Sequence, residues 1–382
     1  MRIRDGYIIR ELDSTYYLLP IGQNIATHKK SVTLNDTSLF LCEQLSVDIT
    51  LPELFHRMAE HFNANDEDLP TLRQDLTVFI DQLNALDILT EDNVIMPADT
   101  YFAIGSVTIG YHGPNELLYP SLLDFTCSTN AFAAADQHWI IIHNIRNAEP
   151  VGQLLIRTQE LCIYYHNDCY DIFFERSSGL MECQLSADFH TAKFFCNGDI
   201  CDSMIEELFY GFRLAFSTIA QSMGCYMLHS VSLLYQDKLW LFSGSSGTGK
   251  STHTTIWNRL FETPIINGDI NCISIDENGV QVHGIPWCGT SKTYDRKSYA
   301  LGGIVLLQQS PDNYVEELTT SAQQLYVMQR LISPTWTVPM MDSNLVFAAE
   351  LTNAVPVYRL HCNTEDTAAI TIKNYIDSHP VS

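Results

Sequence analysis

Positive charge is scarce in this sequence of 382 residues. Lys and Arg together number 21 against 45 Asp and Glu, which gives a formal net charge of −24 at pH 7. A surface this negative repels nucleic acid and anionic membranes, so neither is an expected partner. An anionic substrate must then be bound by a local set of donors and not by a general positive field.

Long apolar runs and paired cysteines are also lacking. No segment approaches the roughly 20 apolar residues that span a bilayer, and Met1-Arg-Ile-Arg-Asp-Gly6 does not resemble a secretory signal. We therefore expect a cytoplasmic protein. The 11 cysteines form no C-x-x-C pair, and the closest two, Cys196 and Cys201, have no matching second pair, so zinc is not expected. In a reducing compartment most of these thiols are expected to be small buried side chains.

The first 95 residues predict a small α+β unit. Short strand patterns come first, at residues 7–11, 16–20 and 31–34. Helix signals follow: Asn35 or Asp36 is a helix cap, Thr50-Leu-Pro-Glu53 is a capping box, and an apolar stripe runs from Leu72 to Leu86. Strands followed by three helices are typical of a winged-helix-like module. Acidic residues outnumber basic ones here, so DNA binding is not expected.

The remaining chain, residues 96–382, predicts an α/β domain with a mixed β-sheet. Residues 97–200 are β-rich, with strand patterns at 139–144, 161–165 and 170–174. Residues 202–223 predict an amphipathic helix that leads into a core at 225–362. The best boundary between the two domains lies at 92–99.

A glycine-rich segment in this core carries the strongest signal. Gly244-Ser-Ser-Gly-Thr-Gly-Lys-Ser251 fits G-x-x-x-x-G-K-[ST] at every fixed position, between a strand pattern at 239–243 and a helix pattern at 251–261. Glycines let successive N–H groups point at phosphates, the lysine reaches the β and γ oxygens, and the serine hydroxyl ligates Mg²⁺. The expected ATP-binding residues are Gly244, Ser245, Ser246, Gly247, Thr248, Gly249, Lys250, Ser251 and Thr252.

A phosphate loop needs a carboxylate to hold the metal, usually after a second strand. Asp269 follows the short apolar run 264–267 and is the expected second ligand of Mg²⁺ beside Ser251. The alternative is that Asp269 is only a turn residue after Gly268.

Several motifs together resemble the HPr serine kinase-like family, which shares its nucleotide fold with ATP-dependent phosphoenolpyruvate carboxykinases. The similarity runs from about residue 100 to the end of the chain, including the strand at 355–360 and the helix after Asn363. The motifs that carry it are His229-Ser230, Ser246-Gly-Thr-Gly-Lys-Ser-Thr-His253, Trp257, Asn267-Gly-Asp269 and Gly284-Ile-Pro-Trp-Cys-Gly289.

The resemblance implies catalytic roles, with one departure from the family pattern. It places His229 near the γ-phosphate, but Gly268-Asp269 stands where the family has two adjacent aspartates, one for the metal and one as the base. Either Asp269 serves both needs or another residue, such as His229, is the base. In the segment after Gly284, Lys292 is the first candidate to stabilise transfer from a flexible basic loop, and a solvated charge cluster is the alternative. The expected catalytic residues are therefore Lys250, Asp269, His229 and Lys292.

Residues 1–95 resemble the PqqD-like family, whose members hold the leader peptides of ribosomally made, modified peptides. The similarity rests on the opening strands, on Val32-Thr-Leu-Asn35 before Leu39-Phe-Leu41, and on the segment from Asp81 to Leu89. In that family the peptide adds as a strand to a sheet edge beside a helix. The alternative is a domain that only mediates contacts within or between copies of the chain.

Together these features predict an ATP- and Mg²⁺-dependent kinase that phosphorylates a hydroxyl, with a Ser or Thr of a precursor peptide held by residues 1–95 as the expected acceptor. A small-molecule kinase on the same fold is one alternative, and a catalytically impaired ATP-binding scaffold is another. Carboxykinase chemistry is disfavoured because arginine is scarce. The family's tendency to assemble implies that a homo-oligomer can form.

Overall fold

A computed structural model describes residues 1–26, 29–47, 49, 51–65, 68–86, 88–89, 98–127, 135–143, 150–166, 168–245 and 247–379. The chain divides into two compact units, Met1–Pro97 and Ala98–Ser382. Most of the predicted boundary at 92–99 lies outside the described residues. Among the described helices, none combines the length and the apolar character needed to cross a bilayer.

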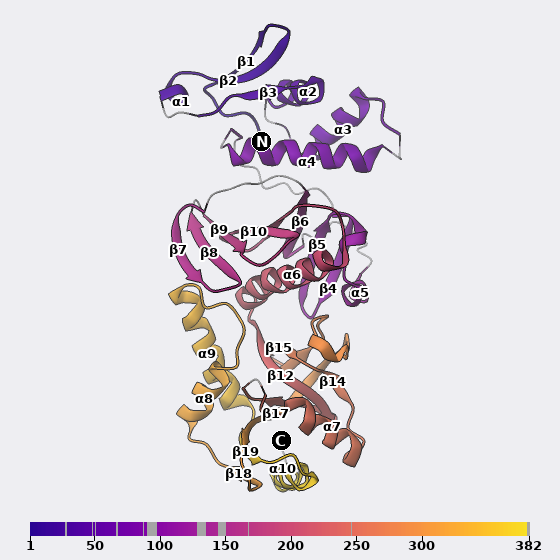
Figure 1. The fold of residues 1–382 in the computed structure, drawn as a ribbon, viewed down its shortest axis with the longest axis vertical. Coiled ribbons are helices and arrows are strands. Elements are labelled where there is room, and N and C mark those ends of the chain that lie inside the picture. The colour runs from indigo at the N-terminus through magenta and orange to yellow at the C-terminus, as the bar shows by residue number, and fades with distance from the viewer. Residues whose placement is uncertain are drawn as a thin grey trace. The chain divides into compact units, whose positions relative to one another are not determined.

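The described residues of unit 1 form a three-stranded antiparallel sheet in the order β1-β2-β3 and four helices (Figure 1). Its elements are β1 (Tyr7–Leu12), β2 (Thr15–Pro20), α1 (Gln23–Ala26), β3 (Val32–Leu34), α2 (Asp36–Gln44), α3 (Leu51–His61) and α4 (Leu69–Ala85). Their apolar sides form a core of their own around Leu41, Leu54 and Leu83, each fully buried. The α+β organisation expected for this segment is confirmed.

The start of α2 is set by its sequence. The side chain of Asn35 accepts the Ser38 N–H at 2.8 Å, and the Ser38 hydroxyl accepts the Asn35 N–H at 2.8 Å. This reciprocal pair satisfies N–H groups that a helix start leaves without partners. The predicted cap at Asn35 is therefore confirmed, whereas the capping box predicted at 50–53 includes Thr50, which lies outside the described residues.

Unit 2 begins with a mixed eight-stranded sheet in the order β4-β5-β6-β11-β10-β9-β8-β7. Strands β5 and β11 pair with β6 in parallel, and the other neighbours are antiparallel. Its elements are β4 (Thr100–Ile104), β5 (Val107–His112), η1 (Asn115–Leu117), α5 (Pro120–Leu123), β6 (Gln137–His143), β7 (Gln153–Arg157), β8 (Leu161–His166), β9 (Cys169–Phe174), β10 (Leu180–Ser186) and β11 (Thr191–Cys196).

A long helix, α6 (Asp202–Ser222), leads into a second mixed sheet, which runs β13-β12-β15-β16-β17-β19-β18 with β14 paired to β12. Its strands are β12 (Cys225–Tyr235), β13 (Lys238–Ser243), β14 (Ile265–Asn267), β15 (Ile270–Asp276), β16 (Gly279–His283), β17 (Ser298–Gln309), β18 (Tyr314–Glu316) and β19 (Val357–Cys362). Strand β17 pairs with β16 through its first residues and with β13 through 301–306, so five strands close on themselves. The mixed sheets expected for this part of the chain are confirmed.

The remaining helices cover the second sheet (Figure 1). They are α7 (Lys250–Phe261), α8 (Thr320–Met328), α9 (Val338–Ala354) and α10 (Asp366–Ser378), and the short helix η2 (Gly289–Ser291) lies between β16 and β17 in the chain. Helices α7 and α10 pack together on one cluster of buried side chains, and α8 and α9 pack on another. A third cluster, centred on Phe212 and Trp139, joins α6 to both sheets. Eight of the eleven cysteines are buried, as predicted for thiols that act as packing side chains.

Candidate functional site

The glycine-rich loop, residues 244–251, joins β13 to α7. Strand β13 is buried between β12 and β17, and its last residue, Ser243, fixes the loop entry by donating its hydroxyl to the His229 carbonyl at 2.7 Å. Gly249 caps α7 with φ of 95°, a conformation that favours glycine. Ser251 and Thr252 are exposed in the first turn of the helix. The strand–loop–helix order is as predicted, and Ser246 lies outside the described residues.

Lys250 folds back over this loop. Its Nζ donates to the Gly244 carbonyl at 3.1 Å and lies 3.5 Å from the Ser245 carbonyl oxygen. Burial lowers the pKa of Lys250, the charge of Asp269 opposes that lowering, and the charge of Arg330 adds to it. The ammonium group is therefore held near the loop with a carboxylate and a second cation close by.

Asp269 lies between β14 and β15, beside His229 of β12. Its Oδ1 is 3.4 Å from Nε2 of His229, and the two side chains are 33% and 37% exposed. The backbone is fixed too, because the Ser230 N–H donates to the Asp269 carbonyl at 2.9 Å. A hydrogen bond from His229 lowers the pKa of Asp269; burial opposes this, and the charges of His229, Arg213 and Lys250 add to it. The carboxylate therefore stays ionised at neutral pH.

The segment 284–292 packs against Asp269 and leaves no room for a second carboxylate. A Cβ on Gly268 would overlap the Oγ and Cβ of Ser291, and a Cβ on Gly289 would lie 2.8 Å from the Cβ of Asp269. Trp287 anchors the segment, since it is buried and its Nε1 donates to the Phe209 carbonyl of α6 at 2.9 Å. The side chain of Ser291 thus leaves room only for glycine at position 268.

Lys292 follows this packed part of the segment. It has φ of 55° and is exposed. Among the described residues its side chain forms no hydrogen bond or ion pair, and it lines neither of the cavities described below. The structure therefore places its backbone near Gly268 but does not join its side chain to the site.

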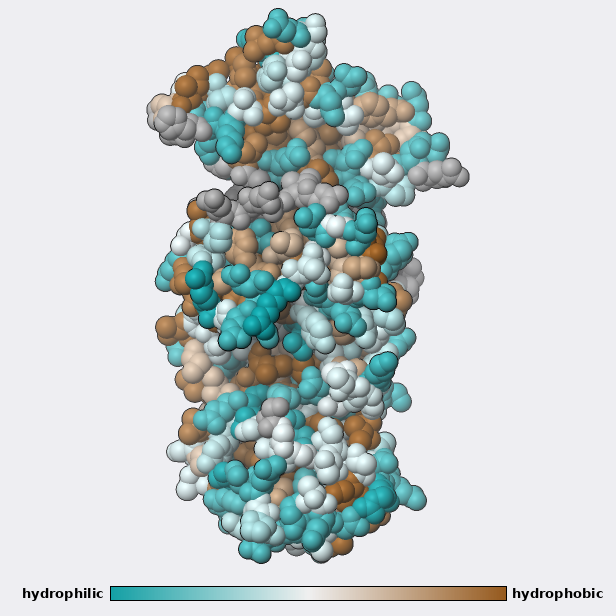
Figure 2. Space-filling model, viewed as in Figure 1, coloured by the Kyte–Doolittle hydropathy of each residue, from teal (hydrophilic) through white to brown (hydrophobic). Residues whose placement is uncertain are grey.

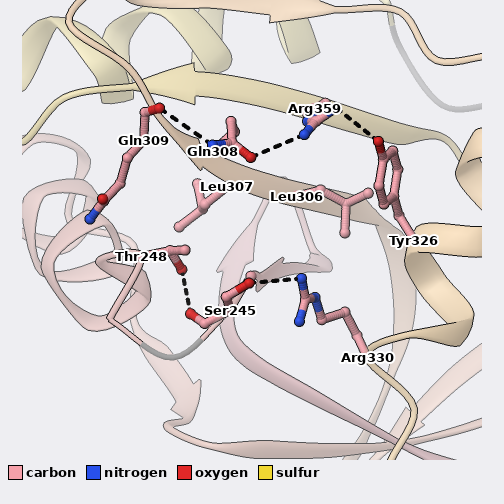
Figure 3. A pocket seen from close by; sticks show the side chains of 10 residues that line it. Ser245, Thr248, Leu306, Leu307, Gln308, Gln309, Tyr326, Arg330 and Arg359 are labelled. Atoms are coloured by element: carbon pink, nitrogen blue, oxygen red, sulfur yellow. Dashed lines mark hydrogen bonds between the residues drawn. The ribbon is translucent and has the colours of Figure 1, made fainter.

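A small cavity of about 190 Å³ lies beside the glycine-rich loop (Figure 3). Arg330, which follows α8, points at the loop and donates from Nη2 to the Ser245 hydroxyl at 3.0 Å. Arg359 of β19 donates to the Tyr326 hydroxyl at 3.1 Å and to Oε1 of Gln308 at 3.0 Å. Two arginines of a chain poor in basic residues thus line the cavity beside the glycine-rich loop.

A larger cleft of about 700 Å³ lies between the two sheets of unit 2. Figure 2 shows hydrophobic residues in the hollow between these parts of unit 2. One stripe of α6 lines it, comprising Glu207, Tyr210, Arg213, Leu214 and Ser217. His229 and Asp269 line it from the second sheet. The candidate site therefore has a loop on one side of Asp269 and a cleft on the other.

The wall of the cleft is held by Glu207. Its carboxylate accepts the N–H groups of Ser178, Gly179 and Leu180 and the hydroxyl of Ser177, at distances from 2.5 to 3.0 Å. Burial raises the pKa of Glu207, but these hydrogen bonds outweigh it and lower the pKa to about 2. The turn at 177–180 is thereby fixed to α6.

Glu207→Gln is expected to lower the free energy of unfolding by about 1–2 kcal/mol at pH 7, a figure discounted for the solvent around this carboxylate. Because the folded pKa lies below the ordinary 4.5, this stabilisation is present above about pH 4.5 and is lost as the pH falls towards 2. Urea unfolding of both proteins at several pH values measures it. The control is Glu206→Gln, at an exposed neighbour on α6. A constant difference between pH 7 and pH 3 would contradict the assigned role.

Arg213 and Arg330 are the site residues that the motifs do not single out. The sequence does contain one indication that Arg213 is special, because it is the only basic residue in the 21 residues of α6. No sequence pattern marks Arg330, since its approach to Ser245 depends on how α8 packs on the second sheet.

Comparisons with known proteins do not assign this chain to a family. No protein-family model matches the sequence, and a search of curated proteins finds no match. The HPr(Ser) kinase/phosphatase from Coxiella burnetii is structurally similar at 10% sequence identity, over 40% of this chain and 89% of that chain, with a TM-score of 0.25. A likeness this low carries no weight for function, and none of the comparisons supports the PqqD-like resemblance of residues 1–95.

Proposed function

We propose that the protein transfers the γ-phosphoryl group of Mg·ATP to the hydroxyl of an acceptor bound in the 700 Å³ cleft. One observation carries this proposal. Asp269 interacts electrostatically with Lys250 of the glycine-rich loop and also lines the cleft beside His229. A phosphate-binding element and an acceptor-sized cleft thus share one carboxylate, as phosphoryl transfer requires.

The triphosphate is proposed to lie on residues 244–252, where loop N–H groups and the N-terminus of α7 favour an anion. Lys250 exchanges its two loop carbonyls for β and γ oxygens, which are better acceptors for a cation. Arg330, bonded to Ser245, adds a second cation on the same side. Lys292 is proposed to approach the γ-phosphate only after the segment that carries it rearranges.

The oxygen donors present fit Mg²⁺. Ser251 offers an exposed hydroxyl at the start of α7, and Asp269 offers a carboxylate that is ionised at neutral pH. In the part of the chain that the structure describes, no group of three or more His, Cys, Asp or Glu can hold a metal ion. Mg²⁺ commonly takes one or two protein oxygens and completes its shell with phosphate and water. When bound, the ion would neutralise charge on the β and γ phosphates.

His229 is the proposed base. A neutral His229 that donates from Nε2 to Asp269 has Nδ1 left as a proton acceptor, and its side chain forms no other hydrogen bond within the described residues. The acceptor hydroxyl gives its proton to His229, its oxygen bonds to the γ-phosphorus, and the bond from that phosphorus to the bridging oxygen of ADP breaks. Asp269 stabilises the imidazolium that forms. The products are the phosphorylated acceptor, ADP and one proton.

Lys250→Ala is expected to weaken Mg·ATP binding by about tenfold to a hundredfold, because it removes a charge-assisted contact to the phosphates. Isothermal titration of the full-length protein measures it. Lys30→Ala, at an exposed lysine of unit 1, is the matched control and should bind like the wild type. A wild-type protein that does not bind Mg·ATP at millimolar concentration would overturn the proposed function.

Two classes of acceptor fit different parts of the chain. A precursor peptide is proposed for unit 1, whose three-stranded sheet has an edge at β3, the kind of edge to which a peptide can add as a strand. A small hydroxyl compound is the second candidate, because 700 Å³ lies within the range of small-molecule sites. Mass spectrometry after incubation with Mg·ATP separates them by which molecule gains a phosphate. ATP binding without any phosphorylated product would favour a scaffold.

A further inference from the structure

Arg213 occupies an unusual position in the cleft. It lies on the α6 stripe that lines the hollow, in a chain where basic residues are scarce. Its guanidinium lies over the ring of Tyr210, 5.1 Å from the centroid, and within the described residues it forms no hydrogen bond or ion pair. A guanidinium has five N–H donors, so the Arg213 side chain can offer several of them to a ligand in the cleft.

The carboxylates around Arg213 do not take up these donors. Glu207 is occupied by the turn at 177–180, and Asp269 is engaged with His229. Glu160 lies exposed at the rim of the cleft and forms no ion pair with Arg213 among the described residues. Arg176, also on the rim, donates to the Gln159 side chain at 3.0 Å. Among the described residues that line the cleft, Arg213 is thus the cation whose side chain has no hydrogen-bonded or ion-paired protein partner.

Electrostatics support this assignment. Burial lowers the pKa of Arg213, and the charge of Asp269 opposes that lowering, so the two groups interact within one cleft. A protein with a net charge of −24 repels an anionic acceptor unless a local cation offsets the repulsion. The rest of the lining is largely apolar, with Leu161, Phe174, Leu180, Leu214, Met227 and Ile270.

We propose that Arg213 binds an anionic group of the acceptor, a carboxylate or a phosphate, while the acceptor hydroxyl lies at His229 and Asp269. The acceptors are then negatively charged hydroxyl compounds with a short, partly apolar spacer between the two groups. Arg213 is suited to this because a guanidinium binds carboxylate and phosphate oxygens in pairs. This inference rests on the proposed function, since it names the class of acceptor for the same site.

The test uses matched pairs of hydroxyl compounds on the full-length protein with Mg·ATP. The pairs are glycerate and glycerol, glycerol 3-phosphate and glycerol, and 3-hydroxy-3-phenylpropanoate and 1-phenylpropane-1,3-diol. Binding is measured by ligand-observed NMR and transfer by ADP formation. We expect the charged member of at least one pair to bind about tenfold more tightly than its neutral partner. The carboxylate and phosphate arms identify which anion is preferred.

Three variants make the test specific to Arg213. Arg213→Met should reduce the preference for the charged member to less than about twofold, and Arg213→Lys should retain part of it. Arg157→Gln, at an exposed arginine of β7 that lines neither cavity, should keep it in full. All variants should bind Mg·ATP like the wild type, which also shows that they are folded.

The two proposals fail in different ways. Wild-type protein that does not bind Mg·ATP would contradict the proposed function itself. Protein that binds Mg·ATP but shows no preference for a charged member in any pair, or an Arg213→Met variant that keeps the preference, would overturn the inference about Arg213 alone.

Discussion

Asp269→Asn is expected to slow phosphoryl transfer about a thousandfold while leaving the fold intact. Asparagine keeps the shape of the side chain, so packing against Gly289 is preserved, but it removes the charge that interacts with His229 and Lys250. Without that charge, the imidazolium formed at His229 loses its partner and a proposed oxygen ligand of Mg²⁺ becomes weaker. The rate of ADP formation at saturating Mg·ATP measures the loss.

The matched control is Asp276→Asn, at the other end of β15, where the carboxylate accepts the Asn278 N–H in an exposed turn. That variant should retain the wild-type rate. An Asp269→Asn protein with more than about a tenth of the wild-type rate would exclude Asp269 from the role proposed here.

Gly268→Asp is expected to inactivate the protein, although it would restore two adjacent aspartates. The Cβ alone would overlap Ser291, so either the segment 284–292 or the chain at Asp269 must move. A displacement of about 1 Å at a reacting group can cost about a hundredfold in rate. The rate of ADP formation and the thermal midpoint should both fall, and a gain in activity would show that the site accepts a second carboxylate.

The cause can be isolated with a pair of smaller changes. Gly268→Ala introduces only the Cβ and should also lose most activity. Ser291→Gly removes the atoms that the Cβ would overlap, after which the next contact is the Cys288 carbonyl oxygen at 3.4 Å, an ordinary separation. The double variant should therefore recover much of the activity lost in Gly268→Ala. Failure of the double variant to recover would place the effect elsewhere.

Local sequence patterns predicted the elements that depend on near neighbours. The cap at Asn35 is set by Ser38, only three residues away. The strand before Gly244 and the helix from Lys250 lie on either side of the glycine-rich loop as predicted. The apolar stripe at 202–223 predicted a helix, which is observed as Asp202–Ser222. In each case residues within about one turn or one strand are enough to indicate the element.

Features that depend on distant segments could not be predicted. The pairing of β13 with β17 joins residues about 60 positions apart, and nothing local to either strand selects it. The sequence shows that position 268 lacks a carboxylate. It does not show why, because the side chain of Ser291, which a Cβ at 268 would overlap, comes from a segment more than 20 residues later. The place of Arg213 in the cleft could not be predicted either, because it depends on the second sheet, which contributes Asp269 and His229 to the same lining.

Helix α6 uses different residues to line the cleft and to contact Trp287. Helix α6 presents one stripe, from Glu207 to Ser217, to the cleft, while Phe209 and Phe216 contact Trp287, with ring centroids 5.7 and 5.0 Å away. Substitutions on the first stripe alter what the cleft accepts without loosening the segment against Asp269. Under the proposed function, substitutions on one side of this helix would therefore change the acceptor, while the contacts on its other side that position Asp269 for transfer would be kept.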